Sequence, residues 1–196
     1  MGENVPAQVD PEHPPLVPGR ACGTCTLCCK VMAIKELDKP QGRWCAHCAA
    51  DRGCRIYGQR PRECRTFFCG YLAIQELTEE WRPSRSKIVL ANESGGNRLV
   101  AHVDPGFPGA WRNEPFYSYL KTWARAAARV RAQVVVYVGM RVIVILPDAD
   151  TDLGVVEDDE LIAVHEIQTP TGLRREAFKV HKNDPRAAGL QLYDKS

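Results

Sequence analysis

The sequence contains no long hydrophobic run, no secretory signal pattern and no marked excess of charge of one sign. A membrane-spanning helix needs roughly 20 consecutive apolar residues, and no stretch of the chain approaches that length. The N-terminus lacks the basic start and apolar region of a signal peptide. The net charge of +2 over 196 residues gives no general attraction to a membrane or to nucleic acid. We therefore expect a cytoplasmic protein without a membrane partner.

Motifs of several enzyme classes are also missing. A phosphate-binding loop needs glycines at fixed spacing before a lysine, and neither "GYLAIQ" nor "ESGGNR" has that spacing. The G-x-S-x-G signature of hydrolases does not occur. The pair His165-Glu166 lacks the second histidine that a zinc-protease helix requires, because Thr169 stands at that position. The sequence leaves open whether the protein is an enzyme, and it identifies no catalytic residue.

Cysteine occurs only in the first part of the chain. Nine cysteines lie within residues 22–69 and none within 70–196. They are Cys22, Cys25, Cys28, Cys29, Cys45, Cys48, Cys54, Cys64 and Cys69. In a reducing compartment, clustered cysteines hold metal or do redox work more often than they form disulfides. The odd number also argues against a disulfide framework, so the cluster predicts a metal-binding protein.

The spacing of these cysteines indicates more than one four-ligand site. Cysteines two residues apart can turn both sulfurs onto one zinc or iron ion. A tetrahedral zinc takes four ligands, and nine cysteines with His47 exceed that number. The adjacent Cys28 and Cys29 point in different directions, which suggests a hypothesis in which each serves a different centre. One cluster with spare thiols is the alternative.

Zinc and iron both remain open as the bound metal. The spacing Cys22-x2-Cys25-x2-Cys28 matches the first three ligands of a bacterial ferredoxin run. The fourth ligand of that run is missing, because Met32 occupies its position. A [4Fe-4S] cluster would need a more distant cysteine to complete it. We favour zinc, because this run is incomplete and because ligands are in excess.

The segments "CGTCTLCC", "WCAHC", "GCRIYGQRP" and "ECRTFFC" resemble the CxxCxxCC (YkgJ-like) family of zinc- or iron-chelating bacterial proteins. The resemblance covers about residues 20–71. It implies metal ligands at Cys22, Cys25, Cys28, Cys29, Cys45, Cys54, Cys64 and Cys69. His47 and Cys48 are further candidate ligands outside that pattern. A relative of this module occurs in a flagellin lysine N-methylase, so the resemblance also permits an enzymatic role.

The region around the cysteines is basic. Residues 21–75 contain nine Lys and Arg against four Asp and Glu, a local charge of +5. Cations near a thiolate centre offset its negative charge. Alternatively, cations with aromatics such as Trp44 and Tyr57 could bind single-stranded nucleic acid. We favour charge compensation, and we expect metal ions rather than nucleic acid as the partner, with an unidentified protein partner left open.

The pattern of the chain predicts an α+β protein in four parts. Residues 1–20 form a flexible Pro-rich arm, 21–75 a small irregular, metal-stabilised cysteine-rich module, 85–182 an α+β domain and 183–196 a tail. In the α+β domain, we expect a mainly antiparallel sheet. Three hairpins are expected, with turns at 94–96, 139–140 and 169–172. One amphipathic helix is expected near 113–132, with Asn113 as its N-cap.

Three functions fit these features. The first is a protein that chelates zinc or iron through clustered thiolates, with two centres as the sharper version. The second is an iron–sulfur protein with a redox or catalytic role. The third is an interaction adaptor in which zinc only folds the module.

Overall fold

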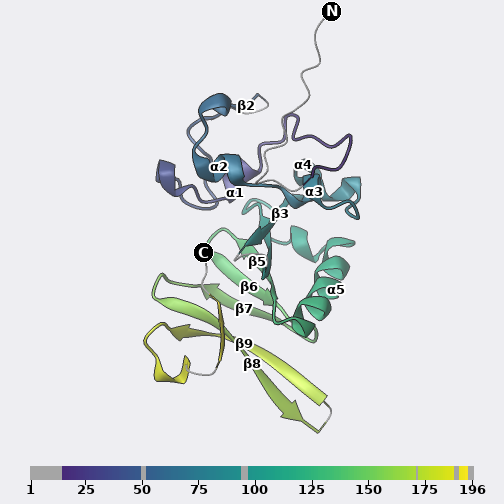
Figure 1. Ribbon diagram of the computed structural model, residues 1–196, viewed down its shortest axis with the longest axis vertical. Helices are drawn as coiled ribbons and strands as arrows, with labels where there is room; N and C mark the ends of the chain where they lie inside the picture. The colour runs from purple at the N-terminus through teal and green to yellow at the C-terminus, as the bar shows by residue number, and fades with distance from the viewer. Residues whose placement is uncertain (1–14, 50–51, 94–96, 171, 188–189, 194–196) are drawn as a thin grey trace, which may run out of the picture.

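A five-stranded β-sheet forms the centre of the computed structural model, which describes residues 15–49, 52–93, 97–170, 172–187 and 190–193 (Figure 1). Its strands are β3 (Ile88–Glu93), β4 (Arg98–Val103), β5 (Gln133–Val138), β6 (Arg141–Ile145) and β7 (Asp150–Val155). They lie in the order β3-β4-β5-β6-β7. All neighbours are antiparallel except β4 and β5, which are parallel.

Helix α5 (Phe116–Arg129) connects the two parallel strands and covers one face of the sheet. Its buried residues are Phe116, Leu120 and Ala124, one stripe of the predicted helix. The prediction that Asn113 caps this helix is wrong. Pro115 is the N-cap, because Asn113 is extended and ends the 3-10 helix η5 (Ala110–Arg112).

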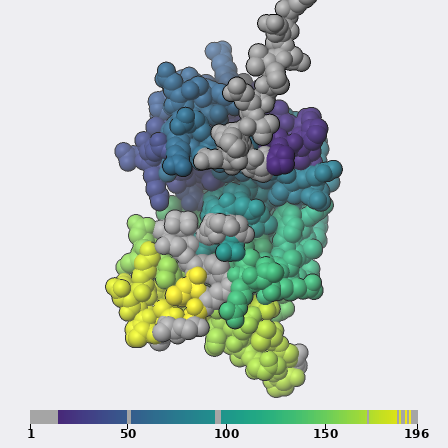
Figure 2. All heavy atoms as spheres, in the orientation of Figure 1, coloured from purple at the N-terminus to yellow at the C-terminus, as the bar shows by residue number. Residues whose placement is uncertain are grey.

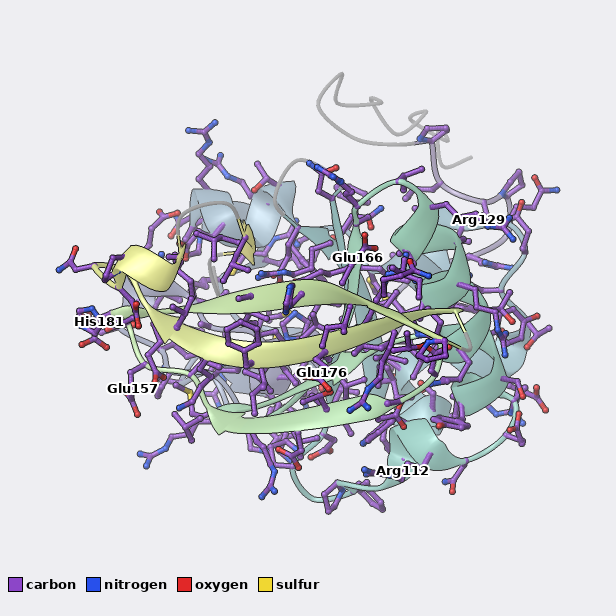
Figure 3. The ribbon with its side chains drawn as sticks, turned by 90° about the horizontal axis from the view of Figure 1, so that it is seen from below. Arg112, Arg129, Glu157, Glu166, Glu176 and His181 are labelled. Atoms are coloured by element: carbon purple, nitrogen blue, oxygen red, sulfur yellow. The ribbon has the colours of Figure 1, made fainter. Side chains whose placement is uncertain are left out.

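The opposite face of the five-stranded sheet is covered by a second, three-stranded sheet. It consists of β8 (Glu160–Thr169), β9 (Gly172–His181) and β10 (Gln191–Tyr193), in the order β10-β8-β9. Ile162 and Ala177 of this sheet pack with Val135 and Val144 of the larger one. Figure 3 shows the long β8–β9 hairpin crossing in front of the sheet. The expected hairpin at 169–172 is confirmed, and the separation into two sheets is additional to the prediction.

The cysteine-rich module consists of short elements above one end of the sheet (Figures 1 and 2). Its helices and strands are α1 (Cys28–Val31), η1 (Lys35–Leu37), β1 (Cys48–Ala49), β2 (Gly53–Cys54), η2 (Tyr57–Gln59) and α2 (Arg62–Thr66). After it come α3 (Gly70–Ala73), η3 (Glu79–Trp81) and α4 (Pro83–Ser86), which lead into β3. A further 3-10 turn, η6 (Pro185–Ala187), precedes β10.

The module is fixed to the end of the sheet where β4 ends and the β5–β6 hairpin turns. Lys30 forms a salt bridge of 2.5 Å with Asp104, and the Gln41 amide lies 3.3 Å from the buried His102 ring. At Gly42, an added Cβ would lie 3.3 Å from the Gly139 Cα. Backbone atoms of the module therefore contact the sheet closely, and a glycine at position 42 permits that approach.

The segment before the module is anchored in its described part. The Val17 amide donates to the Leu72 carbonyl at 2.8 Å. The Arg20 guanidinium donates to four backbone carbonyls in α3 and the segment that follows it, those of Tyr71, Ile74, Gln75 and Leu77. Residues 15–20 therefore pack against the module and its connection to the sheet. The flexible arm predicted for 1–20 stays a prediction for residues 1–14, which lie outside the described residues.

The structure confirms the α+β class, with helices and a mainly antiparallel but mixed sheet. Within the part of the chain that it describes, no helix combines the length and apolar character needed to cross a membrane.

Candidate metal centre

Four cysteines surround a small cavity between the module and strand β3. These four, which we call the inner group, are Cys22, Cys25, Cys28 and Cys69. The cavity has a volume of about 20 Å³, and Leu72 and Val89 also line it. Val89 is 1 % exposed and packs with Leu27 and Val31 of the α1 segment. The inner group is therefore built against the core of the protein.

Local backbone structure brings the first cysteines of the inner group together. The Cys25 amide donates to the Cys22 carbonyl at 2.9 Å. This turn contains Gly23 with φ +55°, a conformation that glycine adopts without strain. The turn leads to α1, which begins at Cys28. Cys69 joins the group from a distant part of the chain, because α3 begins directly after it and packs on β3.

The other five cysteines form a second group centred on Cys29. This outer group consists of Cys29, Cys45, Cys48, Cys54 and Cys64. The Cys45 amide donates to the Cys29 carbonyl at 2.9 Å. The Cys29 thiol hydrogen-bonds to the thiols of Cys28 and Cys48. Cys64 interacts electrostatically with Cys29, Cys45 and Cys54.

The strand pair β1–β2 places two members of the outer group opposite each other. Cys48 and Cys54 are directly paired in its register. Together with Arg52 and Arg55, they line an open hollow of about 470 Å³. The outer group is thus accessible from solvent on this side, whereas the inner cavity is small and lined largely by apolar atoms.

Five of the nine thiols have raised pKa values and are held largely in their protonated form. Burial raises the pKa of Cys69 to about 12, and it is also the first cause of raised pKa values at Cys48 and Cys64. The pKa of Cys29 is raised first by its hydrogen bond with Cys28 and then by burial. Although Cys22 is an exposed residue, burial of its thiol is the first cause of its raised pKa. These five thiols therefore carry little negative charge at neutral pH.

A buried lysine lies beside the outer group. Lys39 is 7 % exposed, and its ammonium donates to the carbonyls of Lys30, at 2.8 Å, and Met32. Burial lowers its pKa, and the nearby thiols of Cys45 and Cys29, among others, oppose that effect. Its charge faces sulfur atoms that become anionic when they bind a metal. Lys39 is therefore the cation best placed to offset such charge.

Arginines lie beside the inner group. Arg60 and Arg82 both act to lower the pKa of Cys22, and Arg82 lines the inner cavity. Arg82 also donates to Glu79 at 3.2 Å. Sequence reasoning included Arg60 and Lys39 in a general positive charge but did not single out Lys39. It missed Arg82, which lies beyond the predicted end of the module at residue 75.

Most, but not all, of the predicted ligands are brought together. The eight cysteines of the family pattern fall into the two groups, and Cys48 belongs to the outer one. All nine cysteines are free thiols. The His47 carbonyl accepts a hydrogen bond from the Arg55 amide at 2.8 Å, but no described residue contacts the His47 ring through a hydrogen bond. Among the described residues, no three His, Cys, Asp or Glu side chains are arranged so that they could hold a metal ion in this conformation.

Comparison with protein-family models, with curated proteins and with solved structures finds no match for this chain. The resemblance to the CxxCxxCC family therefore rests on the cysteine-rich segments alone and stays a prediction.

Proposed function

We propose that this protein binds zinc at two thiolate centres, one in each cysteine group. The observation that carries the proposal is the division of nine thiols into four around one small cavity and five around Cys29. Each group can supply the four sulfur ligands of a tetrahedral zinc. Binding requires a movement of the thiols, because among the described residues they do not enclose an ion in this conformation.

The size of the inner cavity supports a single ion there. A site of roughly 10–15 Å³ holds one water-sized object, and the inner cavity has about 20 Å³. A [4Fe-4S] cube has eight core atoms, so the cavity would have to expand to hold it. Three of these cysteines pack against buried apolar residues, which opposes such expansion. This geometry favours zinc over the iron–sulfur alternative.

The surrounding cations support thiolate chemistry. A centre with four thiolates and one Zn²⁺ carries two net negative charges. Lys39 lies beside the outer group, and Arg60 and Arg82 lie beside Cys22 of the inner group. This arrangement supports the charge-compensation reading of the basic module.

The proposal includes membership of the CxxCxxCC family and a cytoplasmic location. The clustered spacing of the cysteines supports this location, because metal-binding cysteines are typical of reducing compartments, in which structural disulfides are rare. Fractionation of cells that express the native gene tests the location, and recovery in an oxidising compartment would contradict it.

The test of the main proposal is metal analysis of protein purified without oxygen. We expect colourless protein with about two zinc ions per chain, since each site takes four ligands. Brown protein with broad absorbance near about 400 nm would replace zinc by an iron–sulfur cluster. Protein without either metal would contradict metal binding altogether.

Cysteine variants test the division into two centres. Cys25→Ala should keep one zinc ion, and the double variant Cys25→Ala/Cys28→Ala should keep the same one. The double variant Cys45→Ala/Cys64→Ala should also keep one zinc ion, held by the inner group. Combining all four substitutions should remove both ions. Loss of both ions in the Cys25/Cys28 double variant would contradict the assignment.

A further inference from the structure

Three exposed apolar side chains lie together where the cysteine-rich module meets the sheet. An added Cβ at Gly42 would lie 3.3 Å from both the Gly139 Cα and the Pro105 Cγ, so three segments of the chain converge at this point. Shortly after that point, each segment carries a large apolar residue that is about half exposed. These residues, which we call the junction surface, are Trp44, Phe107 and Met140, exposed to 54, 53 and 49 %.

The Lys30 side chain connects the two aromatic residues of the junction surface. Its ammonium forms the 2.5 Å salt bridge with Asp104 and lies 5.5 Å from the centre of the Trp44 ring. An added Cβ at Gly106, the residue before Phe107, would lie 3.7 Å from the same ammonium. Trp44 and Phe107 therefore belong to one continuous surface, although they come from the module and from the loop after β4.

The composition of the junction surface is typical of a protein interface. Single exposed apolar residues are ordinary on a folded protein, whereas adjoining ones mark sites of interaction. Tryptophan, phenylalanine and methionine are also the residue types enriched in the buried centre of interfaces. Because all three residues of the surface belong to these types, it is a candidate docking site for another molecule.

Positive charge without a counter-charge accompanies the junction surface. The Lys87 ammonium lies 5.3 Å from the centre of the Phe107 ring, and Arg43, which precedes Trp44, is exposed. Neither of these two cations forms an ion pair with a residue that the structure describes. Since interfaces are arranged with complementary charge, this combination favours an acidic partner with apolar side chains.

Single-stranded nucleic acid is the other class of partner that combines negative charge with flat apolar groups. It binds where cations follow its backbone and where successive bases stack on aromatic rings. Met140 offers no ring for stacking, and the charge of Lys30 is already neutralised by Asp104. An acidic protein segment therefore fits the junction surface better.

We propose that the junction surface docks an acidic protein segment. Its apolar side chains pack against Trp44, Phe107 and Met140, and its carboxylates face Lys87 and Arg43. The surface includes none of the nine cysteines, so the proposal stands apart from the proposed zinc centres. The zinc content of the same preparation keeps the two separate, because protein that lacks zinc but binds the acidic segment fails only the proposed function.

The experiment measures peptide binding to the full chain, purified without oxygen, by fluorescence anisotropy. The probe is a fluorescein-labelled peptide with leucine and phenylalanine on one helix face and glutamate elsewhere. A matched peptide carries lysine at each glutamate position. We expect the glutamate peptide to bind at least about tenfold more tightly than the lysine peptide. Equal affinities, or no binding of the glutamate peptide, would overturn the proposal.

Aromatic variants test the location of the docking site. Trp44→Ala and Phe107→Ala should each weaken binding of the glutamate peptide by at least about tenfold, the effect of losing an aromatic anchor. Tyr57→Ala is the matched control and should leave the affinity unchanged. Tyr57 is 64 % exposed and has the Arg60 guanidinium 3.7 Å from its ring centre, but it lies outside the junction surface. Equal weakening by all three substitutions would reject the junction surface as the site.

Charge variants test the acidic character of the partner. The double variant Arg43→Gln/Lys87→Gln should abolish the preference for the glutamate peptide over the lysine peptide. Arg125→Gln/Arg129→Gln removes the same charge from exposed positions on α5 and should leave that preference unchanged. An unaltered preference in the Arg43/Lys87 variant would contradict the proposed carboxylate contacts.

Two other occupants of the junction surface would be recognised by different results. Tighter binding of a thymidine oligonucleotide than of the glutamate peptide would assign the surface to single-stranded nucleic acid. Self-association in light scattering that Trp44→Ala abolishes would assign it to a second copy of the chain. Either result would overturn the acidic partner.

Discussion

The substitution Gly70→Ala tests how closely the cysteine-rich region packs against the sheet, because it adds a single methyl group between α3 and β3. Gly70 follows Cys69 and begins α3, which packs on β3. An alanine Cβ at this position would lie 2.8 Å from the Leu90 Cβ and 3.3 Å from the Ile74 Cδ1. Carbon atoms in contact stand about 3.5–4.0 Å apart, so the Leu90 distance is too short by roughly 0.7–1.2 Å.

The cost of Gly70→Ala follows from this clash. Both carbon atoms are attached directly to the backbone, so no side-chain rotation relieves the contact, and Leu90 is 2 % exposed. Overpacking of this kind costs about 1–3 kcal/mol. The higher helix propensity of alanine offsets about 0.5–1 kcal/mol of this cost, and the offset is smaller at the first residue of a helix. We expect a net loss of about 1–2 kcal/mol, or about 2–8 °C in Tm for a chain of this size.

Urea unfolding followed by tryptophan fluorescence measures this loss in the metal-loaded protein. Gly58→Ala is the matched control, because Gly58 also lies in a short helix of the module and an added Cβ meets nothing within 4 Å. It should change the unfolding free energy by less than about 0.5 kcal/mol. Equal stability of the two variants would refute the close packing of α3 on β3. Zinc release from Gly70→Ala should also be faster at the inner centre, since the clash displaces the residue that follows Cys69.

Three further predictions concern charged groups and thiols. Arg20→Met should lower the free energy of unfolding by about 2–4 kcal/mol in urea, because four backbone carbonyls lose a charged donor. A decrease in unfolding free energy below about 0.5 kcal/mol would mean that water replaces the guanidinium. Lys39→Met should lower the affinity for one of the two zinc ions by about tenfold in chelator competition, whereas substitution of the exposed Lys35 by Met should leave both affinities unchanged. Equal effects of the two substitutions would argue against a specific counter-charge at Lys39. Because the raised pKa values of Cys22, Cys29, Cys48, Cys64 and Cys69 keep these thiols protonated at neutral pH, binding should release at least about two protons per zinc, and affinity should rise with pH up to those pKa values. Calorimetry in buffers of different protonation enthalpy measures this release, and a value near zero would show that the thiols are already ionised.

The parts of the fold that the sequence predicted are those with local signals. Strands β5 and β6 have near-continuous apolar runs around Gly139, which has φ +59°, and they pair as expected. The other two predicted strand pairs are also antiparallel partners. Helix α5 follows the spacing of its apolar residues, although it begins later than predicted. Periodicity and turn residues act over a few positions, so they identify elements reliably.

The arrangement of those elements depended on contacts that no local pattern contains. The parallel pairing of β4 with β5 joins residues on either side of α5. Trp81 is 1 % exposed and packs against Phe116 and Tyr119, yet it comes from a segment without strong periodicity. Burial against a distant surface decides such positions, and that surface exists only after folding.

The candidate site shows the same limit. Spacing alone made the cysteines candidate ligands, and it raised the hypothesis that Cys28 and Cys29 serve different centres. It could not assign Cys69 to Cys22 and Cys25, because α3 and β3 bring that residue into place. It also could not identify Lys39 as the buried cation, since burial of a lysine depends on the carbonyls that accept its protons.

The position of strand β3 links the proposed inner zinc site to the solubility of the protein. Strand β3 is one of the two edge strands of the large sheet, and exposed strand edges promote aggregation. Its residues Ile88, Val89 and Leu90 are each at most 2 % exposed, because α3 and the α1 segment cover them. If the inner group holds zinc as proposed, loss of that ion would loosen this cover and expose an apolar strand edge to other copies of the chain. Zinc starvation should therefore be visible first as light scattering from associating protein, before the sheet itself unfolds.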